Sequence, residues 1–302
     1  MRAGPLCFRA AWVYGRGMNG LSSTLRDATD ALTPVSATPR LDAELLMAHA
    51  LGIDRSAMLL RMHDLAVPPA FAAMLARRVA DEPVAYITGM QAFWDLNLHV
   101  TPDVLIPRAD SETVIEVAMA AFAGRGAPAR ILDLGTGSGA LLLAALSVFS
   151  GAEGVGIDAS AAALAVASGN ASRLGLDGRA YFERRDWTLD GWADGLGQFD
   201  LILCNPPYIE DATPLADMVA RHEPHSALFA GPDGLRDYRI LLKTLEKLLK
   251  TTGIAVFEIG FNQSKSVAKL GTEAGFTSEL THDLSGNPRA LRFSLGIAQP
   301  NR

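Results

Sequence analysis

The stretch Ile131-Leu132-Asp133-Leu134-Gly135-Thr136-Gly137-Ser138-Gly139 decides the fold of this 302-residue chain. Its first four residues predict a short apolar strand, and residues 140–148 predict a helix. The glycines between them permit a tight turn and let a ligand approach the backbone, beside the exposed N–H groups of a helix N-terminus. The stretch predicts a strand–loop–helix unit with a ligand at the loop, although a glycine-rich turn without a ligand also fits.

The residues that follow alternate between short apolar runs and helical patterns. Strands are predicted at residues 154–158, 180–183, 199–204 and 254–259, and helices at residues 161–174 and 235–250. Short apolar strands separated by helices imply an α/β domain whose mostly parallel sheet is covered on both faces. Residues 277–284 and 290–295 are strand-like runs joined by a turn-rich segment, so we expect an antiparallel pair at the sheet edge.

The N-terminal part of the chain has a different pattern. Apolar residues recur at helix spacing in residues 18–82, where prolines divide them into short helices, so we predict a small helical bundle. Residues 83–110 predict a connector with a β-hairpin, whose strands we place at 93–100 and 104–107, before the α/β domain at 111–302.

Residues 1–17 are an expected disordered extension, and Met18 is an alternative start. Arg9 interrupts the apolar stretch of these residues, which argues against a signal peptide.

The composition narrows the class of partner. A formal net charge of −6 and a pI near 5.5 argue against a partner held mainly through phosphate contacts, because such binding needs a basic surface. The two cysteines, Cys7 and Cys204, are too few for a disulfide framework, and nothing resembles a metal cluster. No apolar run reaches the roughly 18 residues of a membrane span. We therefore expect a cytoplasmic protein that binds no metal, no membrane and no nucleic acid directly.

Three groups of residues at the predicted carboxyl edge of the sheet suit an adenosine cofactor. Asp158 ends a strand, where a carboxylate can accept hydrogen bonds from both ribose hydroxyls, but it also fits a helix N-cap. Asp186 and Trp187 offer an adenine ring a hydrogen-bond partner and an apolar wall, although a partly buried tryptophan needs no ligand. The loop residues predicted to contact the cofactor are Gly135, Thr136, Gly137, Ser138 and Gly139. Because Ala140 completes a dinucleotide pattern, G-x-G-x-x-G/A, the loop alone leaves the cofactor open.

The run Asn205-Pro206-Pro207-Tyr208 follows the strand predicted at residues 199–204 and indicates the chemistry. Two prolines fix φ and remove N–H donors, so carbonyls of the turn can point into a cleft, and Tyr208 adds a flat face. An amide –NH₂ has two donors, which the side-chain oxygen of Asn205 and the carbonyl of Pro206 can accept. We predict that Asn205, Pro206 and Tyr208 are catalytic and that Pro207 shares the substrate site; a proline-stiffened loop is the alternative.

An amide nitrogen is a poor nucleophile, because its lone pair is delocalised into the carbonyl. Holding it in line with a sulfonium methyl group supplies proximity, worth up to ~7–11 kcal/mol in favourable cases. Acceptor dipoles also favour the positive charge that develops on nitrogen. The run therefore predicts methylation of an amide nitrogen by S-adenosylmethionine.

Further motifs extend over nearly the whole chain, from about residue 21 to residue 293. They are residues 40–46, 83–89, 93–94, 106–108, the glycine loop, 205–209, 223–224 with 227–228, 234–235 with 238–239, and 258–260. As a set they resemble the bacterial release factor glutamine methyltransferase family, also called HemK or PrmC, within the class I Rossmann-like methyltransferases.

The resemblance implies a seven-stranded methyltransferase sheet and a helical N-terminal domain that helps to dock the substrate. It also implies that Asn205 contacts the cofactor as well as the substrate. It implies that S-adenosylmethionine methylates the amide N5 of the glutamine in the Gly-Gly-Gln motif of class 1 peptide chain release factors, proteins of translation termination, and leaves S-adenosylhomocysteine. One segment departs from the family pattern Pro-Arg-Pro-Glu-Thr-Glu, because here residues 107–112 are Pro-Arg-Ala-Asp-Ser-Glu. A salt bridge fastening the hairpin explains Arg108 and Glu112 in this segment as well as a role in the site does.

Three other functions compete. An enzyme that methylates the exocyclic amine of adenine offers the same –NH₂ geometry, but it needs a basic groove and a flipped base, and this chain is acidic. A ribosomal protein glutamine is a second substrate of the same chemistry. A non-catalytic nucleotide-binding module would use the glycine loop alone.

Overall fold

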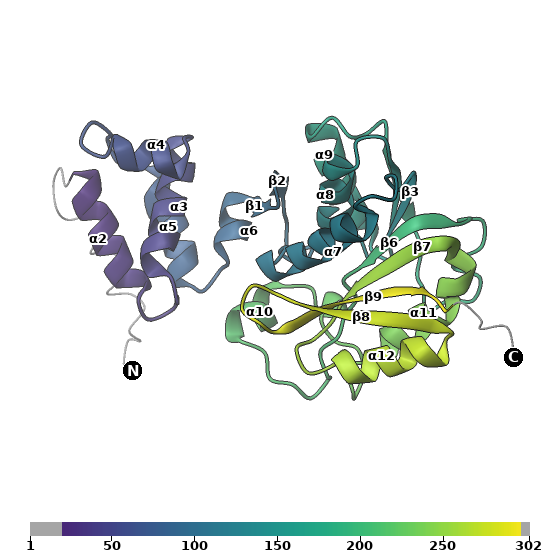
Figure 1. The fold of residues 1–302 in the computed structure, drawn as a ribbon. Helices are drawn as coiled ribbons and strands as arrows, with labels where there is room; N and C mark the ends of the chain where they lie inside the picture. The colour runs from purple at the N-terminus through teal and green to yellow at the C-terminus, as the bar shows by residue number, and fades with distance from the viewer. Residues whose placement is uncertain (1–19, 297–302) are drawn as a thin grey trace, which may run out of the picture. The chain divides into compact units, whose positions relative to one another are not determined.

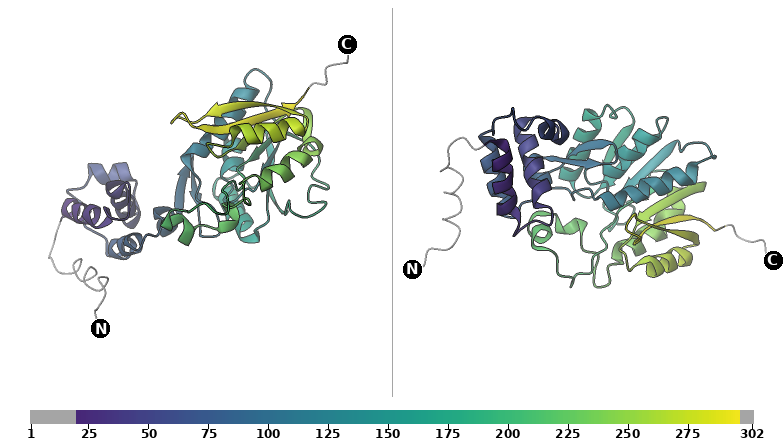
Figure 2. Two further views of the ribbon diagram at one scale, coloured as in Figure 1. Left: turned by 90° about the horizontal axis from the view of Figure 1, so that it is seen from below. Right: turned by 60° about the vertical axis from the view of Figure 1, so that its left-hand side comes forward.

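The computed structural model describes residues 20–296 and groups them into two compact units (Figures 1 and 2). The first unit contains residues 20–89 and 216–222, and the second contains residues 90–215 and 223–296. The predicted extension at residues 1–17, with Met18, lies outside the described residues. No helix within residues 20–296 combines the length and the apolar character that crossing a bilayer demands.

The first unit is the predicted small helical bundle. Its helices are α2 (Leu21–Leu32), α3 (Pro39–Leu51), α4 (Arg55–Leu60), α5 (Ala70–Val79), α6 (Val84–Thr88) and α10 (Asp217–His222). Leu25, Leu46, Met58 and Phe71 come from four different helices and are almost fully buried against one another. Pro39 begins α3 and Gly52 ends it in the left-handed conformation, as expected for residues at these two ends.

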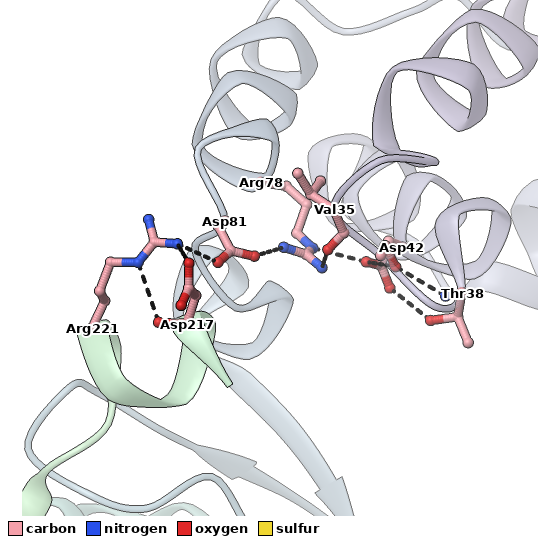
Figure 3. A network of polar contacts seen from close by, with 8 residues as sticks. Val35, Thr38, Asp42, Arg78, Asp81, Asp217 and Arg221 are labelled. Atoms are coloured by element: carbon pink, nitrogen blue, oxygen red, sulfur yellow. Dashed lines mark hydrogen bonds and ion pairs between the residues drawn. The ribbon is translucent and has the colours of Figure 1, made fainter. Parts of the chain in front are cut away.

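A buried arginine connects the helices of this unit, as Figure 3 shows. Arg78 on α5 is only 4% exposed; it donates to Asp42 Oδ2 at 2.8 Å and to the carbonyl of Val35 at 3.0 Å, and its Nη1 lies 3.5 Å from Asp81 Oδ1. Asp81 also accepts from Arg221 on α10 at 3.0 Å. Burial of a guanidinium is tolerated where its donors are paired. The network links α3, α5 and α10 across long stretches of sequence.

The second unit contains the predicted mostly parallel seven-stranded sheet, in the order β5-β4-β3-β6-β7-β9-β8. Its strands are β3 (Arg130–Leu134), β4 (Glu153–Asp158), β5 (Ala180–Arg184), β6 (Phe199–Cys204), β7 (Leu249–Glu258), β8 (Phe276–His282) and β9 (Pro288–Leu295). The first five pair in parallel, whereas β9 runs antiparallel to both β7 and β8. Figures 1 and 2 show β8 and β9 side by side as yellow arrows, so the predicted antiparallel edge is confirmed.

Helices cover both faces of this sheet. Leu201 and Leu203 of β6 belong to the core beneath α7 (Glu112–Phe122) and α8 (Ala140–Val148), together with Ala171 of α9 (Ala161–Arg173). Ile202 and Cys204 point to the other face, in the core with α11 (Arg236–Leu248) and α12 (Ser264–Glu273). A strand buried on both faces needs apolar residues at consecutive positions, which explains the unbroken Leu-Ile-Leu-Cys run of β6.

Three predicted elements differ from the structure. Residues 93–100 and 104–107 do not pair; the hairpin is instead β1 (Met90–Phe93) with β2 (Leu96–His99), and Trp94 turns the chain with a φ of 57°. The helix predicted to reach residue 250 ends at Leu248, because Leu249 already pairs with Phe199 in the sheet. The strand predicted at residues 254–259 accordingly begins at Leu249. The errors arise where an apolar pattern continues across a change of secondary structure.

We expect Gly271→Ala to destabilise the protein although alanine favours helices. A Cβ at Gly271 on α12 would lie 2.3 Å from Cε1 of the buried Phe293, so overpacking should cost about 1–3 kcal/mol of unfolding free energy. The matched control is Gly169→Ala on α9, where a Cβ meets nothing within 4 Å and helix propensity should add about 0.5–1 kcal/mol. Urea denaturation measures both; a stabilised Gly271→Ala protein would contradict the packing described here.

Candidate active site

The predicted cofactor and substrate motifs meet where the strand order reverses. β3 lies between β4 and β6 in the sheet. β3 and β6 pair in parallel, with Leu134 opposite Cys204. The glycine loop follows β3 and the Asn205–Tyr208 run follows β6, so both leave the same edge of the sheet side by side. Open α/β sheets bind ligands at this switch point.

The glycine loop has the open backbone that a close ligand requires. Gly135 has a φ of 74°, and a Cβ there would lie 3.0 Å from Cη2 of Trp187, so only glycine fits. The backbone N–H groups of Gly135 and Thr136 both donate to the carbonyl of Ile157 at 2.9 Å, which ties the loop to β4. Gly137 has a φ of 54°, and a Cβ there would enter open space. The loop is therefore anchored at its start and accessible at its middle.

Asp133 is a buried acid beneath this loop, at a position predicted only as part of a strand. It is 1% exposed, and its Oδ2 accepts from the hydroxyl of Thr136 at 2.6 Å. Within residues 20–296, its Oδ1 has no hydrogen-bond partner. Burial raises the pKa of Asp133 to about 7, although the hydrogen bond from Thr136 opposes the rise.

Asp158 faces the glycine loop rather than capping a helix. Its Oδ2 accepts from the N–H of Gly137 at 3.0 Å and its Oδ1 from the N–H of Ser160 at 2.9 Å. Ser160 is the N-cap of α9, since its hydroxyl accepts from the N–H of Ala163 at 3.1 Å. Burial raises the pKa of Asp158. The carboxylate thus stands beside the accessible part of the loop, where the predicted ribose contact requires it.

Trp187 and Asp186 have different surroundings. The indole of Trp187 lies against Gly135, and its Nε1 donates to Oδ1 of the buried Asp237 on α11 at 2.7 Å. Asp186 accepts from both the N–H and the hydroxyl of Thr188, at 2.9 and 2.7 Å, and these hydrogen bonds lower its pKa. The structure therefore places Trp187 at the glycine loop, whereas Asp186 is held by its own turn.

The Asn205–Tyr208 run is rigid and partly buried. Pro206 and Pro207 are buried, whereas Asn205 and Tyr208 are half-buried. Nδ2 of Asn205 donates to the hydroxyl of Ser111 at 3.3 Å, and the phenol of Tyr208 donates to Oε1 of Glu258 at 3.4 Å. Hydrogen bonds thus hold both ends of the run.

A second clamp holds the backbone of the same run. Nε2 of Gln263 donates to the carbonyl of Tyr208 at 2.9 Å and to that of Gly234 at 3.2 Å, while its Oε1 accepts from the N–H of Gly260 at 3.0 Å. A Cβ at Gly234 would lie 2.4 Å from the Tyr208 carbonyl oxygen, so this approach requires glycine. No motif in the sequence points to Gln263, because its partners lie 3, 29 and 55 residues away.

The segment that departs from the family pattern makes structural contacts. The guanidinium of Arg108 pairs with the buried Glu223, which also accepts from the N–H of Ile106 at 3.4 Å. Glu112 accepts from the N–H of Trp94 at 2.8 Å, and so supports the turn of the β1–β2 hairpin. Asp110 pairs with Arg289 at 3.1 Å. The predicted salt bridge that fastens the hairpin is therefore not what these residues form: Arg108 pairs with Glu223 outside the hairpin, and Glu112 holds the hairpin through a hydrogen bond.

Two family models match the chain. The first is the PrmC N-terminal domain, at residues 23–89, and the second is a methyltransferase domain, at residues 127–279. The release factor glutamine methyltransferase of Rhodospirillum rubrum is 44% identical over 268 residues, which cover 87% of this chain and 81% of that protein. The protein of the same name from Caulobacter vibrioides is 40% identical, over 87% of this chain and 90% of that protein.

A solved structure supports the fold. The crystal structure of the hMettl16 catalytic domain in complex with MAT2A 3′UTR hairpin 6 matches with a TM-score of 0.52 and 13% identity. The match covers 76% of this chain and 84% of that one. At this identity the likeness concerns the fold alone.

We expect Asp133→Asn to stabilise the protein at alkaline pH. The pKa of Asp133 rises from 3.8 to about 7 on folding, so the folded state binds its proton more tightly. The stabilisation from this tighter proton binding is fully present below about pH 4 and is lost as the pH rises through about 7. Asparagine stays neutral and can still accept from Thr136, so the variant should gain about 1–3 kcal/mol over wild type at pH 8.

Thermal melts at pH 5 and pH 8 measure this gain, which should shrink at the lower pH. The control is Asp103→Asn on an exposed turn, which should have the same melting temperature as wild type at both pH values. A gain of equal size at both pH values, or a loss at pH 8, would contradict the burial argument.

Proposed function

Because this chain belongs to the release factor glutamine methyltransferase family, we propose that it methylates the side-chain amide N5 of the glutamine in the Gly-Gly-Gln motif of class 1 release factors, using S-adenosylmethionine. The observation that carries the proposal is the juxtaposition of the glycine loop after β3 and the Asn205–Tyr208 run after β6. A substrate that works on the ribosome implies a cytoplasmic enzyme.

The residues around the glycine loop fit the cofactor. The open space beside Gly137 admits a ligand to the backbone, and the neighbouring carboxylate of Asp158 can accept hydrogen bonds from ribose hydroxyls. Trp187 supplies an apolar wall next to Gly135, with Asp186 beside it in the chain. The cofactor-binding loop in this proposal is Gly135, Thr136, Gly137, Ser138 and Gly139. When bound, S-adenosylmethionine supplies a methyl group on a positively charged sulfur, and S-adenosylhomocysteine is the product.

The run after β6 holds the glutamine amide. Asn205 uses its Nδ2 to bind Ser111, so its Oδ1 is the end that accepts from the substrate –NH₂. The Pro206 carbonyl accepts the second N–H, and the adjacent Pro207 stiffens the turn. The phenol of Tyr208 is bound to Glu258, which orients the ring beside the amide.

This arrangement addresses the weakness of an amide nucleophile. Two fixed acceptors hold the nitrogen in place and favour the positive charge that develops on it. Methylation leaves one proton too many on the nitrogen, and an amide protonated on nitrogen is a strong acid that gives this proton to water. Asn205, Pro206 and Tyr208 therefore act by position and dipole, and the site needs no strong base before transfer.

Two other substrates use the same geometry. The exocyclic amine of adenine offers an equivalent –NH₂, but the net charge of −6 disfavours a nucleic-acid partner. A ribosomal protein glutamine differs only in the protein that presents it. The match to the PrmC N-terminal domain over residues 23–89 favours the release factor.

We expect Asn205→Ala to abolish transfer while cofactor binding persists. Loss of one polar group that is oriented toward the reacting nitrogen should lower the rate of methyl transfer to purified release factor by about 100-fold or more. A preorganised group of this kind contributes a factor of about 10²–10³ to the rate. Calorimetry should show S-adenosylmethionine binding within about three-fold of wild type, since the glycine loop and Asp158 remain. The matched control is Asn287→Ala, in the exposed turn between β8 and β9, which should change neither quantity.

Radiolabelled methyl transfer measures this effect, with DNA, RNA and ribosomal proteins as parallel substrates. Wild-type label on the release factor, lost in Asn205→Ala, supports the proposal. Label on nucleic acid or on a ribosomal protein instead, or undiminished transfer by Asn205→Ala, would overturn it.

A further inference from the structure

Asn170 on α9 is a buried amide that connects the glycine loop to the β1–β2 hairpin. It is 1% exposed, and its Oδ1 accepts from the N–H of His99 on β2 at 2.8 Å. Its Nδ2 donates to the carbonyl of His99 and to the carbonyl of Ser138 in the glycine loop, both at 2.9 Å. A primary amide has two N–H donors, and each carbonyl takes one of them. The three partners therefore fix the orientation of this side chain.

The hairpin gives Asn170 a fixed point of attachment. Within residues 20–296, β2 has β1 as its one neighbouring strand, so Asn170 takes the place of a third strand at His99. Phe93 and Leu98 anchor the hairpin in the core that also contains Ala171 of α9. An apolar residue at position 170 would leave backbone groups unpaired, which explains a polar side chain here but not its contact with the cofactor loop.

α9 holds two parts of the proposed cofactor site in a fixed relation. The N–H of its N-cap, Ser160, binds the carboxylate of Asp158 at 2.9 Å, and Asn170 lies about 15 Å further along the helix. A Cβ at Gly139 would lie 3.3 Å from the Cβ of Ala167, so the helix also packs directly on the end of the glycine loop. One rigid helix therefore supports both the carboxylate and the loop.

The contact with Ser138 anchors the glycine loop at its second end. Gly135 and Thr136 tie the start of the loop to β4, and a Cβ at Gly137 in the middle would enter open space. With Asn170 the loop is held on both sides of this accessible point. A loop that is already ordered binds its ligand more tightly, because it loses less conformational freedom on binding.

We propose that Asn170 is a positioning residue for the cofactor. By holding the carbonyl of Ser138 beside the hairpin, it keeps the backbone at Gly137 in the conformation that receives S-adenosylmethionine. The inference rests on the cofactor of the proposed function and deepens that function, because it names a residue outside the cofactor motifs that sets the affinity. It also gives the hairpin a part in cofactor binding.

Asn170→Asp tests this role with almost no change in shape. A carboxylate still accepts from His99, but it has no donor and sets a negative oxygen against two carbonyls. Calorimetry at pH 8 should show the dissociation constant for S-adenosylmethionine rising about ten-fold or more, the loss of about one hydrogen bond. The matched control is Ser147→Ala, which removes the hydroxyl that donates to Asp95 of the hairpin at 3.2 Å. Its affinity should stay within about two-fold of wild type, because the loop contact remains.

The rate of transfer separates positioning from a general loss of structure. Once saturating S-adenosylmethionine holds the loop, Asn170→Asp should react within about three-fold of the wild-type single-turnover rate. A folded Asn170→Asp protein with wild-type cofactor affinity would overturn the proposal. A protein whose affinity and saturated rate fall together would overturn it as well.

Hydrogen exchange in wild type tests the same link without a substitution. Coupling between two sites is reciprocal, so S-adenosylmethionine should slow exchange of the His99 N–H by about three-fold or more. The control amide is Gly286, which donates to the carbonyl of Asp283 at 2.9 Å in the turn between β8 and β9 and should be unaffected. Equal slowing of both amides, or slowing of neither, would contradict the role of Asn170. A wild-type protein that binds the cofactor but methylates no amide would instead overturn the proposed function and leave both binding tests in force.

Discussion

The parallel, in-register pairing of β3 with β6 is the constraint on which the rest of this structure depends. Four consecutive residue pairs, from Ile131 with Leu201 to Leu134 with Cys204, bring two unrelated loops to one edge of the sheet. A slip of one residue would turn every side chain of one strand to the opposite face and misplace Asn205. The burial of β6 on both faces enforces the register, since each of its last four residues is fully buried.

The loops at this edge lie over two buried carboxyl groups, and the ionisation of either group lowers the free energy of unfolding. Burial raises the pKa of Asp133 and of Glu258 to about 7, so each destabilises the protein when it ionises. Each also has a buried oxygen without a partner among the described residues. Departures of this kind from the rules of packing are expected where a site needs a particular charge or hydrogen-bond direction. Their positions, directly beneath the glycine loop and beside Asn205, agree with that expectation.

The strongly patterned elements could be predicted from sequence almost to the residue. The helix at residues 140–148 and the strand at 199–204 were predicted with the bounds that the structure shows, because each is a dense apolar run with glycine or proline beyond one end. The hairpin was misplaced, because no pattern signals that Trp94 adopts a φ of 57°, which is rare for a residue other than glycine. In α3, Leu41 and Leu45 follow the helical spacing and are nevertheless exposed, since spacing alone does not show which face is covered.

The site was predictable where a motif is local and missed where it depends on distant residues. The glycine loop, Asp158 and the Asn205–Tyr208 run occur as short motifs at strand ends, so their meeting could be inferred from topology. Ser111 and Gln263 contact that run from 94 and 55 residues away, and their residue types are too common to attract attention. Such supporting contacts arise only from the fold and cannot be recognised in the sequence.

Tandem mass spectrometry of purified release factor, after incubation with this protein and S-adenosylmethionine, tests the proposed methylation directly. We expect a gain of one methyl group on the Gly-Gly-Gln peptide, with the fragment ions placing it on the glutamine side chain. A methyl group on another residue, or an unmodified Gly-Gly-Gln peptide from a preparation that binds the cofactor, would contradict it.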